Sequence, residues 1–235
     1  LQRMTTSALE LDTAGSITVD GISAANSQNA DDITLVSGGA TLFDNNPSAF
    51  DSLTVLADNG ITVNQDLSSV VGDIALDGDA NDAADGIDSI TFAGGVQVTA
   101  AGSLTLEAST GDMTGAGALT LNADNGIMIL DSLTTAGLAT LNADANAAGG
   151  GDLAVASGAT IDTAGNALEV TANDLDLQGG LLAGSILVTD SDGTGIGLGG
   201  TATAGGLNID GAELQRMTTS ALELDTAGSI TVDGI

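Results

Sequence analysis

Apolar and polar residues alternate one by one in many short segments of this chain. Leu9 and Leu11 flank Glu10, and Ile17 and Val19 flank Thr18 in the next segment. This alternation places apolar side chains on one face of an extended strand and polar side chains on the other. The pattern returns at residues 33–35, 53–55, 61–63, 74–76, 90–92, 96–98, 104–106, 119–121, 127–129, 153–155, 168–170, 175–177, 186–188 and 207–209. No 12-residue window carries a helical apolar stripe, so the sequence predicts an all-β chain.

The spacing of these segments predicts how the strands are arranged. Short Gly-, Asn- and Asp-rich turns such as 58–60 and 124–126 separate them. Leu53 and Ile74 are 21 residues apart, and so are Ile186 and Leu207. A period near 20 residues is typical of one coil of a right-handed parallel β-helix, or β-solenoid. We expect a continuous rod of roughly ten coils, stacked at about 4.8 Å and therefore about 5 nm long per repeat.

A string of β-sandwich domains is the competing fold. Such domains run to about 100 residues and usually bury a Trp or Tyr. This chain has no Trp, no Tyr and only three Phe. Ala, Val, Ile and Leu suit a thin interior, and the single proline, Pro47, falls outside every predicted strand. These observations favour the solenoid.

A 22-residue segment occurs twice. Residues 1–22 and residues 214–235 both read LQRMTTSALELDTAGSITVDGI. Identical sequence at a fixed offset indicates a tandem array. We therefore expect residues 1–213 to be one full solenoid repeat unit and residues 214–235 to be the start of the next identical repeat. No Pro-rich or otherwise distinct linker separates them, so the rod is expected to pass through this boundary unbroken.

The charge of the chain restricts its partners. It has 32 acidic residues against two basic ones, Arg3 and Arg216, for a formal net charge of −30. Such a surface repels nucleic acid and anionic lipid and attracts divalent cations. No apolar run of about 18 residues is present, so no membrane span is expected in this segment. Each Arg is expected to pair with a carboxylate, with Glu213 and Glu10 as candidates.

Three stretches resemble a known family. They are GGLNIDGAELQRMTTSALELDTAGSITVDGI at 205–235, DDITLVSGGATLFD at 31–44 and DSLTVLADNGITVNQ at 51–65. They are similar to repeats of filamentous haemagglutinin-like large bacterial exoproteins. The resemblance implies a secreted, extracellular β-helical adhesin or fibre at the bacterial cell surface. This sequence contains neither the secretion domain of that family nor an Arg-Gly-Asp triplet, so neither export route nor receptor is carried over.

Two functional hypotheses follow. One is a structural repeat of a giant secreted fibre or surface appendage, which forms a rigid acidic rod. The other is the stalk of a cell-surface adhesin that mediates attachment, with calcium as a candidate cofactor. The expected partners are neighbouring repeats of the same protein, lateral copies of the fibre and divalent cations.

One acidic stretch has the spacing of a calcium loop. Oxygen-bearing side chains fall at positions one, three, five, nine and twelve of a 12-residue segment, namely Asp77, Asp79, Asn81, Asp85 and Asp88. The segment departs from the calcium-loop pattern in having Asp82 where Gly is usual and Asp88 where Glu is usual. A solvated acidic loop is the alternative interpretation. Asp190 and Asp192 form a second, weaker cation candidate, with an ordinary Asx turn as its alternative.

Enzyme activity is not expected. The chain has no His, Cys or Lys, which removes most acid–base and nucleophilic chemistry. Carboxylate pairs could hydrolyse glycosides, but 32 acids give such pairs by chance and no aromatic side chains are arranged to stack on sugars. We therefore predict no catalytic and no cofactor-binding residues. Outward Thr ladders, which include Thr18, Thr62 and Thr91, are interpreted as β-propensity rather than as an ice-binding array.

Overall fold

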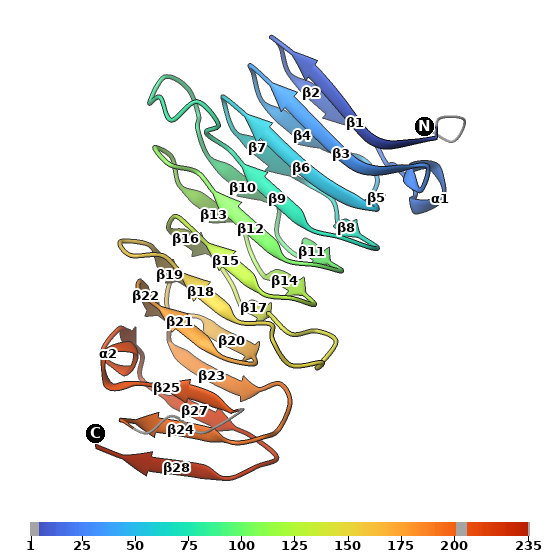
Figure 1. Ribbon diagram of the computed structural model, residues 1–235. Helices are drawn as coiled ribbons and strands as arrows, with labels where there is room; N and C mark the ends of the chain where they lie inside the picture. Colours follow the sequence, from blue (N-terminus) through green and yellow to red (C-terminus); the bar gives the residue numbers. More distant parts are fainter. Residues whose placement is uncertain (1–4, 201–205, 235) are drawn as a thin grey trace.

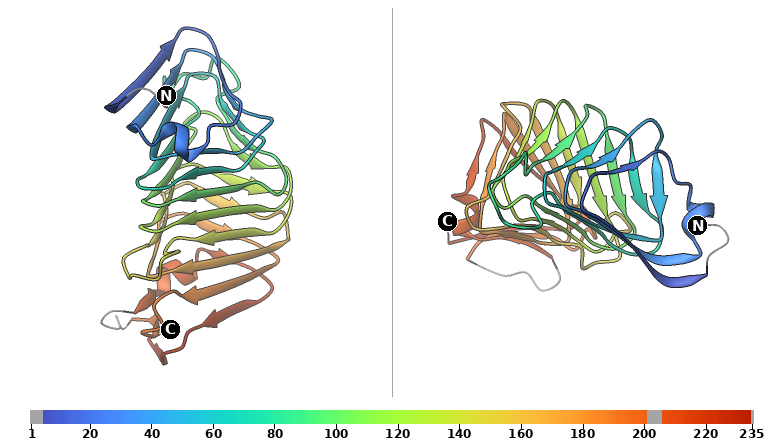
Figure 2. Two further views of the ribbon diagram at one scale, coloured as in Figure 1. Left: turned by 90° about the vertical axis from the view of Figure 1, so that its right-hand side faces the viewer. Right: turned by 90° about the horizontal axis from the view of Figure 1, so that it is seen from above.

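The computed structural model describes residues 5–200 and 206–234. The chain winds as a parallel β-solenoid with three faces, and each turn of the winding adds one strand to each face (Figure 1). Every strand pair is parallel. Seen from the side and from above, the coils stack into an elongated body (Figure 2). The predicted all-β parallel solenoid of roughly ten coils is therefore confirmed.

Three large sheets, here named A, B and C, form the faces, and none closes on itself. Sheet A contains β1 (Thr6–Thr13), β3 (Ala30–Ser37), β6 (Ser52–Ala57), β9 (Ile74–Asp77), β12 (Leu104–Glu107), β15 (Ile127–Ile129), β18 (Leu153–Val155) and β21 (Leu175–Leu177). Sheet B contains β2 (Ile17–Val19), β4 (Thr41–Phe43), β7 (Ile61–Val63), β10 (Ile90–Phe92), β13 (Met113–Gly115), β16 (Leu133–Thr135), β19 (Thr160–Asp162), β22 (Gly180–Leu182) and β26 (Met217–Thr218). Sheet C contains β5 (Ser48–Phe50), β8 (Leu67–Ser69), β11 (Gln97–Ala100), β14 (Leu119–Ala123), β17 (Ala139–Asn142), β20 (Ala167–Ala172), β23 (Ser185–Asp190) and β27 (Leu222–Asp225).

A fourth, smaller sheet breaks the sequential order. Sheet D holds β25 (Leu207–Ile209), β24 (Ile196–Gly199) and β28 (Ile230–Asp233), in that spatial order. It lies below the last strand of sheet A, and β25 contacts β21 (Figure 1). Because β24 precedes β25 in the sequence but lies beyond it in the sheet, the chain steps forward along the rod and then returns. Sequence periodicity did not predict this step.

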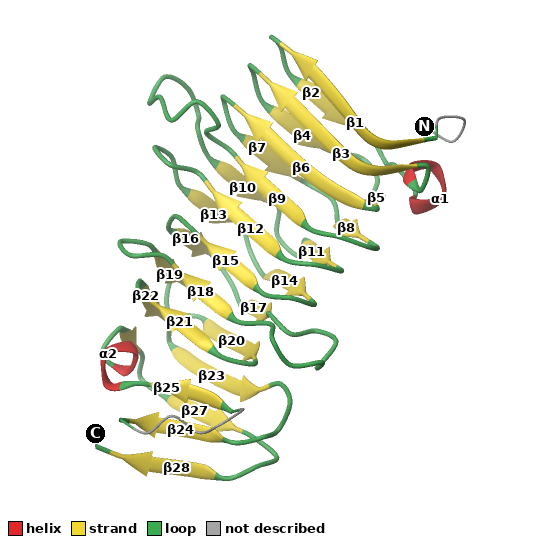
Figure 3. Ribbon diagram, viewed as in Figure 1, coloured by secondary structure: helices red, strands yellow, loops and turns green. Residues whose placement is uncertain are grey.

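Two one-turn helices interrupt the strands within the described residues (Figure 3). Helix α1 (Ala24–Ser27) occupies the place of a sheet C strand in the first coil and packs on β5, where Ser27 Oγ donates to the Ala49 carbonyl at 2.9 Å. Helix α2 (Gly211–Leu214) begins at Asp210, whose side chain accepts from two helix amides in a capping box with Glu213. Four-residue helices are too short to leave a periodic apolar stripe, which is why the sequence pattern did not indicate them.

Aliphatic ladders fill the interior. The inward positions of successive strands stack in register, as in the row Ile33, Leu53, Ile74, Leu104 and Ile127 of sheet A. All five side chains are buried. The three phenylalanines, which are the only aromatic residues, are also interior. Alternation along the strands of the inner coils thus gives one dry face and one wet face, as the sequence predicts, whereas the terminal strands β1 and β28 lack a buried face.

The outward threonines are divided among the faces. Thr62, Thr91, Thr114 and Thr134 form one continuous row on sheet B. Thr34 pairs with Thr54 on sheet A, and Thr120 pairs with Thr140 on sheet C. Each strand of these rows contributes one outward Thr, so the rows are one residue wide. They fit the interpretation that like side chains stack between coils.

Candidate functional sites

The predicted calcium loop projects from a corner of the rod. It runs from the end of β9 to the start of β10, so it joins sheets A and B, and it extends beyond the neighbouring turns (Figure 1). Asp82 and Asp88 adopt left-handed backbone angles, φ 54° and 52°. Asp can adopt this region because its side chain bonds locally. The residue that occupies the usual Gly position of a calcium loop therefore takes the turn conformation that such a Gly provides.

The five candidate ligands differ sharply in exposure. Asp79 and Asp88 are buried, with 1% and 4% of their surface exposed. Asp77 is half-buried, whereas Asn81 and Asp85 are exposed. The loop thus holds two carboxylates inside and turns two oxygen-bearing side chains towards solvent.

Four of these side chains accept hydrogen bonds from backbone amides. Asp77 Oδ1 accepts from the Asp79 amide at 3.0 Å, and Asn81 Oδ1 accepts from Ala83 at 2.8 Å. Asp88 Oδ2 accepts from Gly86 at 3.1 Å. All three contacts are local, between residues two positions apart, and those of Asp77 and Asn81 are Asx turns, as the solvated-loop interpretation requires. The fourth is different, because Asp79 Oδ2 accepts from the Thr110 amide of the next coil, at 2.8 Å.

Two carboxylate oxygens in the loop have no hydrogen-bond partner. Asp79 Oδ1 and Asp88 Oδ1 are both buried and unpaired. Asp88 Oδ1 lies against Gly86, where a Cβ atom would come within 2.9 Å of it and within 1.6 Å of Asn59 Oδ1. Asn59 comes from the preceding coil and was not among the sequence-predicted ligands. Since buried carboxylate oxygens are normally paired, these atoms are candidates for cation contact.

The loop does not assemble a complete acidic cage. Within residues 5–200 and 206–234, no group of three or more Asp or Glu side chains has an arrangement that could hold a metal ion. The backbone bonds described above turn the carboxylates towards different amides rather than towards one centre. Burial raises the pKa of Asp77, and the negative charges of Glu107, Asp82 and Asp79 raise it further, while the Asp79 amide opposes them. Keeping Asp77 ionised in this loop therefore already costs free energy.

The second acidic candidate, at residues 190–195, forms a turn. Asp192 Oδ1 accepts from the Thr194 amide at 3.1 Å, which is an Asx turn. Asp190 is buried, and its Oδ2 accepts from the Gly195 amide at 2.8 Å and from Thr226 Oγ1 at 2.7 Å. Asp190 Oδ1 has no partner. The geometry is that of an ordinary turn, with Asp190 joining two coils.

Two side chains at helix α2 bind the backbone of a sheet strand. Glu213 Oε1 accepts from the Leu177 amide at 3.1 Å, and Arg216 Nη1 donates to the Leu177 carbonyl at 2.6 Å. Leu177 ends β21, so both polar groups of this residue are satisfied by side chains instead of by a following strand. Among the described residues Arg216 donates to this carbonyl and pairs with no carboxylate, so the predicted ion pair is wrong. Arg3 lies outside the described residues. Sequence reasoning missed the contact because it joins residues 39 positions apart.

Two carboxylates near this contact are partly desolvated. Burial raises the pKa of Glu213, and the negative charges of Asp210 and Asp174 raise it further. Burial likewise raises the pKa of Asp174, although its Oδ1 accepts from the Asn208 amide at 2.8 Å and from the Leu175 amide at 3.0 Å. Both carboxylates accept hydrogen bonds from backbone amides, and the burial of their negative charge costs free energy.

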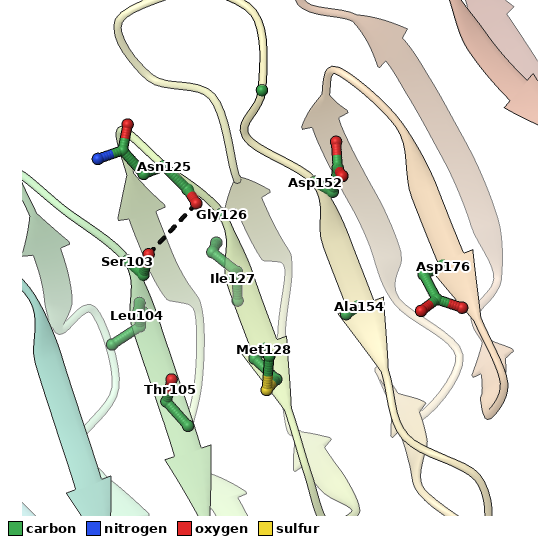
Figure 4. Close-up of a pocket in the computed structure, with 11 residues that line it drawn as sticks. Ser103, Leu104, Thr105, Asn125, Gly126, Ile127, Met128, Asp152, Ala154 and Asp176 are labelled. Atoms are coloured by element: carbon green, nitrogen blue, oxygen red, sulfur yellow. Dashed lines mark hydrogen bonds between the residues drawn. The ribbon is translucent and has the colours of Figure 1, made fainter.

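The outer face of sheet A carries a shallow hollow of about 230 Å³ (Figure 4). In the outward row Thr105, Met128, Ala154 and Asp176, the small Ala154 leaves space between its larger neighbours. Ser103 Oγ donates to the Asn125 carbonyl at 3.3 Å along one edge of this hollow. Its only ionisable residues are Asp152 and Asp176. The hollow offers carboxylates and aliphatic surface and no cationic group.

Comparisons with known proteins give no match to a family model, to a curated protein or to a solved structure. In the part of the chain that the structure describes, no helix is long and apolar enough to cross a membrane.

Proposed function

We propose that this chain is a structural repeat of a large secreted fibre, in which it forms a rigid acidic rod. The observation that supports this best is the duplicated 22-residue segment built into a solenoid whose sheets run along its length. Each coil of a solenoid contacts only its neighbours, so adding repeats lengthens the rod without changing its cross-section. The function is mechanical: backbone hydrogen bonds join coil to coil along the rod axis.

The acidic coat supports the same proposal. A net charge of −30 spread along a rod keeps neighbouring rods apart and soluble, and divalent cations reduce that repulsion. Lateral copies of the fibre are then bridged or separated according to the cation concentration. From the resemblance of its repeats to haemagglutinin-like exoproteins, we propose that such a fibre lies at the surface of a bacterial cell.

An adhesin stalk is the second candidate. Its support is the loop at residues 78–89, which projects from the A–B corner and holds two buried, unpaired carboxylate oxygens. A projecting loop is a suitable place for partner contact, because binding residues are disproportionately found on loops held by a rigid scaffold. In this version the loop binds calcium, and the receptor contact lies on the loop or beyond the described residues.

Immunogold electron microscopy tests the fibre. Antibodies raised against the 235-residue chain are applied to the producing cells, with cells that lack the gene as control. We expect gold along extended surface filaments, at intervals that are multiples of about 5 nm for a rod of roughly ten coils. Label confined to the cell interior would rule out the fibre, and label only at filament tips would favour the adhesin.

A further inference from the structure

The duplicated segment lies in two different environments. The N-copy, residues 1–22, is described from residue 5, and the C-copy, residues 214–235, is described to residue 234. In the N-copy, the LELD strand lies in sheet A and the ITV strand in sheet B, as β1 and β2. In the C-copy, the same strands lie in sheets C and D, as β27 and β28. One sequence therefore occupies two different pairs of faces.

The two copies of the LELD strand use opposite edges. In the N-copy, Leu9 is in register with Ile33 of β3, the strand that follows along the rod. In the C-copy, the equivalent Leu222 is in register with Ile186 of β23, the strand that precedes it. A single strand could thus pair with both neighbours, placing Ile186, the shared leucine and Ile33 in one inward row.

The backbone bonds of the two copies are complementary. The Thr13 carbonyl of the N-copy accepts from Gly38 of the following coil, at 2.8 Å. The Ala221 carbonyl of the C-copy accepts from Ile186 of the preceding coil, also at 2.8 Å. Ala221 is equivalent to Ala8. Because Thr13 and Ala8 are an odd number of positions apart, the carbonyls that accept hydrogen bonds in the two copies point to opposite edges of the strand. A parallel strand bonds to its two neighbours with alternate residues, so the two sets of bonds can coexist.

The ITV strand shows the same complementarity. In the N-copy, the Ile17 amide donates to Ala40 and the Val19 carbonyl accepts from Asp44, both at 3.0 Å. In the C-copy, the carbonyls of Ser229 and Asp233 accept from the amides of Ile196 and Gly200, at 2.9 and 2.7 Å. These two residues are equivalent to Ser16 and Asp20 of the N-copy. A single ITV strand could therefore bond to both neighbouring strands without any of these backbone groups serving two partners.

Side-chain exposure agrees with this pairing. Val19 is buried with 6% of its surface exposed, because the following coils cover it. The equivalent Val232 is 62% exposed, and Ile230 is 47% exposed. The C-copy thus presents apolar side chains that the N-copy environment covers.

We propose that one copy of this segment joins successive repeats, so that sheet C of one repeat continues as sheet A of the next and sheet D continues as sheet B. This inference rests on the tandem fibre proposed above and adds its geometry. Each repeat is then turned about the rod axis by one face, about a third of a turn for a three-faced solenoid. The partner that fits each end of the repeat is the neighbouring repeat, held by parallel strand pairing. The loop at 78–89 consequently points in three directions over three repeats and then returns to the first.

The pairings are tested first in the 235-residue chain, which contains no Cys. Thr34→Cys with Glu10→Cys, and Leu187→Cys with Glu223→Cys, replace outward residues in direct register. Both pairs are expected to form intramolecular cross-links with a short thiol reagent. Failure of either pair would overturn the arrangement of the copies, and with it the proposal.

The rotation is tested in a longer chain made of residues 1–213 followed by residues 1–235. Leu187→Cys in the first repeat and Thr34→Cys in the second flank one shared strand, two strand spacings or about 10 Å apart. Thr34→Cys with Ala75→Cys inside one repeat has the same separation and serves as the positive control. We expect the junction pair to cross-link as efficiently as this control, with the same shift in gel mobility.

Two further pairs distinguish the other ways of stacking. Thr34→Cys of the second repeat is combined with Asp176→Cys, on sheet A of the first repeat, or with Leu182→Cys, on sheet B. Cross-linking of the Asp176 pair would indicate an unrotated rod, and cross-linking of the Leu182 pair a rotation in the opposite sense. Either result in place of the Leu187 pair would overturn the proposal. These results do not depend on where the protein is located, so immunogold labelling and cross-linking can fail independently.

Discussion

Arg216 and Leu177 are joined across 39 sequence positions by a hydrogen bond of 2.6 Å from the guanidinium Nη1 to the carbonyl oxygen. Leu177 is the last residue of β21, and its backbone bonds to side chains from the region of helix α2 instead of to another strand on the next coil. A backbone carbonyl that has lost its strand partner must find another donor. The solenoid thus uses one of its two cations to satisfy a sheet backbone rather than to neutralise an acid.

We predict that Arg216→Gln destabilises the fold by about 1.5–3 kcal/mol, because hydrogen bonds that involve a charged group contribute on this scale and the Leu177 carbonyl loses its donor. Urea unfolding followed by circular dichroism measures the change. Gln215→Ala is the control, since Gln215 is exposed beside it. Equal stability of wild type and Arg216→Gln would show that water replaces the guanidinium without cost.

Stability is predicted to rise as the pH falls from neutrality. Burial raises the pKa of Asp77, Asp174 and Glu213 above the ordinary values of 3.8 for Asp and 4.5 for Glu. For such groups the folded state holds protons more tightly than the unfolded state. Their contribution to stability is complete below the ordinary pKa and is lost as the pH rises through the raised one. Melting temperatures measured from about pH 7 down to about pH 4 should therefore increase.

Asp174→Asn tests which group causes this dependence. One oxygen, Oδ1, accepts both amide bonds at this residue, so an amide side chain retains them and loses only the charge. We expect a weaker pH dependence and a higher melting temperature at neutral pH. Asp31→Asn removes the same charge at an exposed position and is the matched control. An identical response of the two variants would assign the effect to overall charge repulsion.

Calcium is predicted to bind at the loop between β9 and β10. Isothermal titration of the whole chain should show binding heat below about 1 mM calcium, the weak end of protein calcium sites. Asp79→Asn with Asp88→Asn should abolish it, because these residues supply the unpaired buried oxygens. Asp192→Asn, in the Asx turn at 190–195, should leave it unchanged. Absence of heat in the wild-type chain would make the solvated-loop interpretation correct.

Phe92→Ala is predicted to cost about 3–5 kcal/mol, because the ring is interior and its removal leaves a cavity. Chemical denaturation measures the loss. Val71→Ala is the control, since Val71 is 69% exposed and its truncation should change stability by less than about 0.5 kcal/mol. A small effect at Phe92 would mean that the coils collapse around the missing ring.

Gly111→Ala is predicted to destabilise the stacking of two coils. A Cβ atom at Gly111 would lie 1.9 Å from the Asp88 carbonyl oxygen, so the backbone of the loop would have to move. Gly211→Ala is the matched control, because nothing lies within 4 Å of its Cβ position. Thermal unfolding should separate the two variants, and equal melting temperatures would contradict the close approach.

The strand pattern could be predicted from sequence because it is local. Leu104 and Leu106, for example, alternate with polar residues because one face of their strand is dry. The coil period followed from the distance between such segments, and small aliphatic residues indicated a thin interior. The candidate loop was also found locally, from the spacing of its acids between 77 and 88. What spacing could not show is that the Asp79 carboxylate turns to Thr110 on the next coil, or that Asn59 lies beside Asp88 Oδ1.

The sequence by itself determined that the chain forms short parallel strands in coils of about 20 residues, and that 22 of its residues occur twice. Only the tertiary structure decided which face each strand occupies. The alternation of a strand fixes which side chains point inward, but it is the same on all three faces of a solenoid. Leu9 and Leu222 therefore have identical local sequences and lie on different sheets. Their positions depend on how many strands and helices the chain places between them, and on the order of β25, β24 and β28 in sheet D. Both are properties of the whole winding and not of any local sequence.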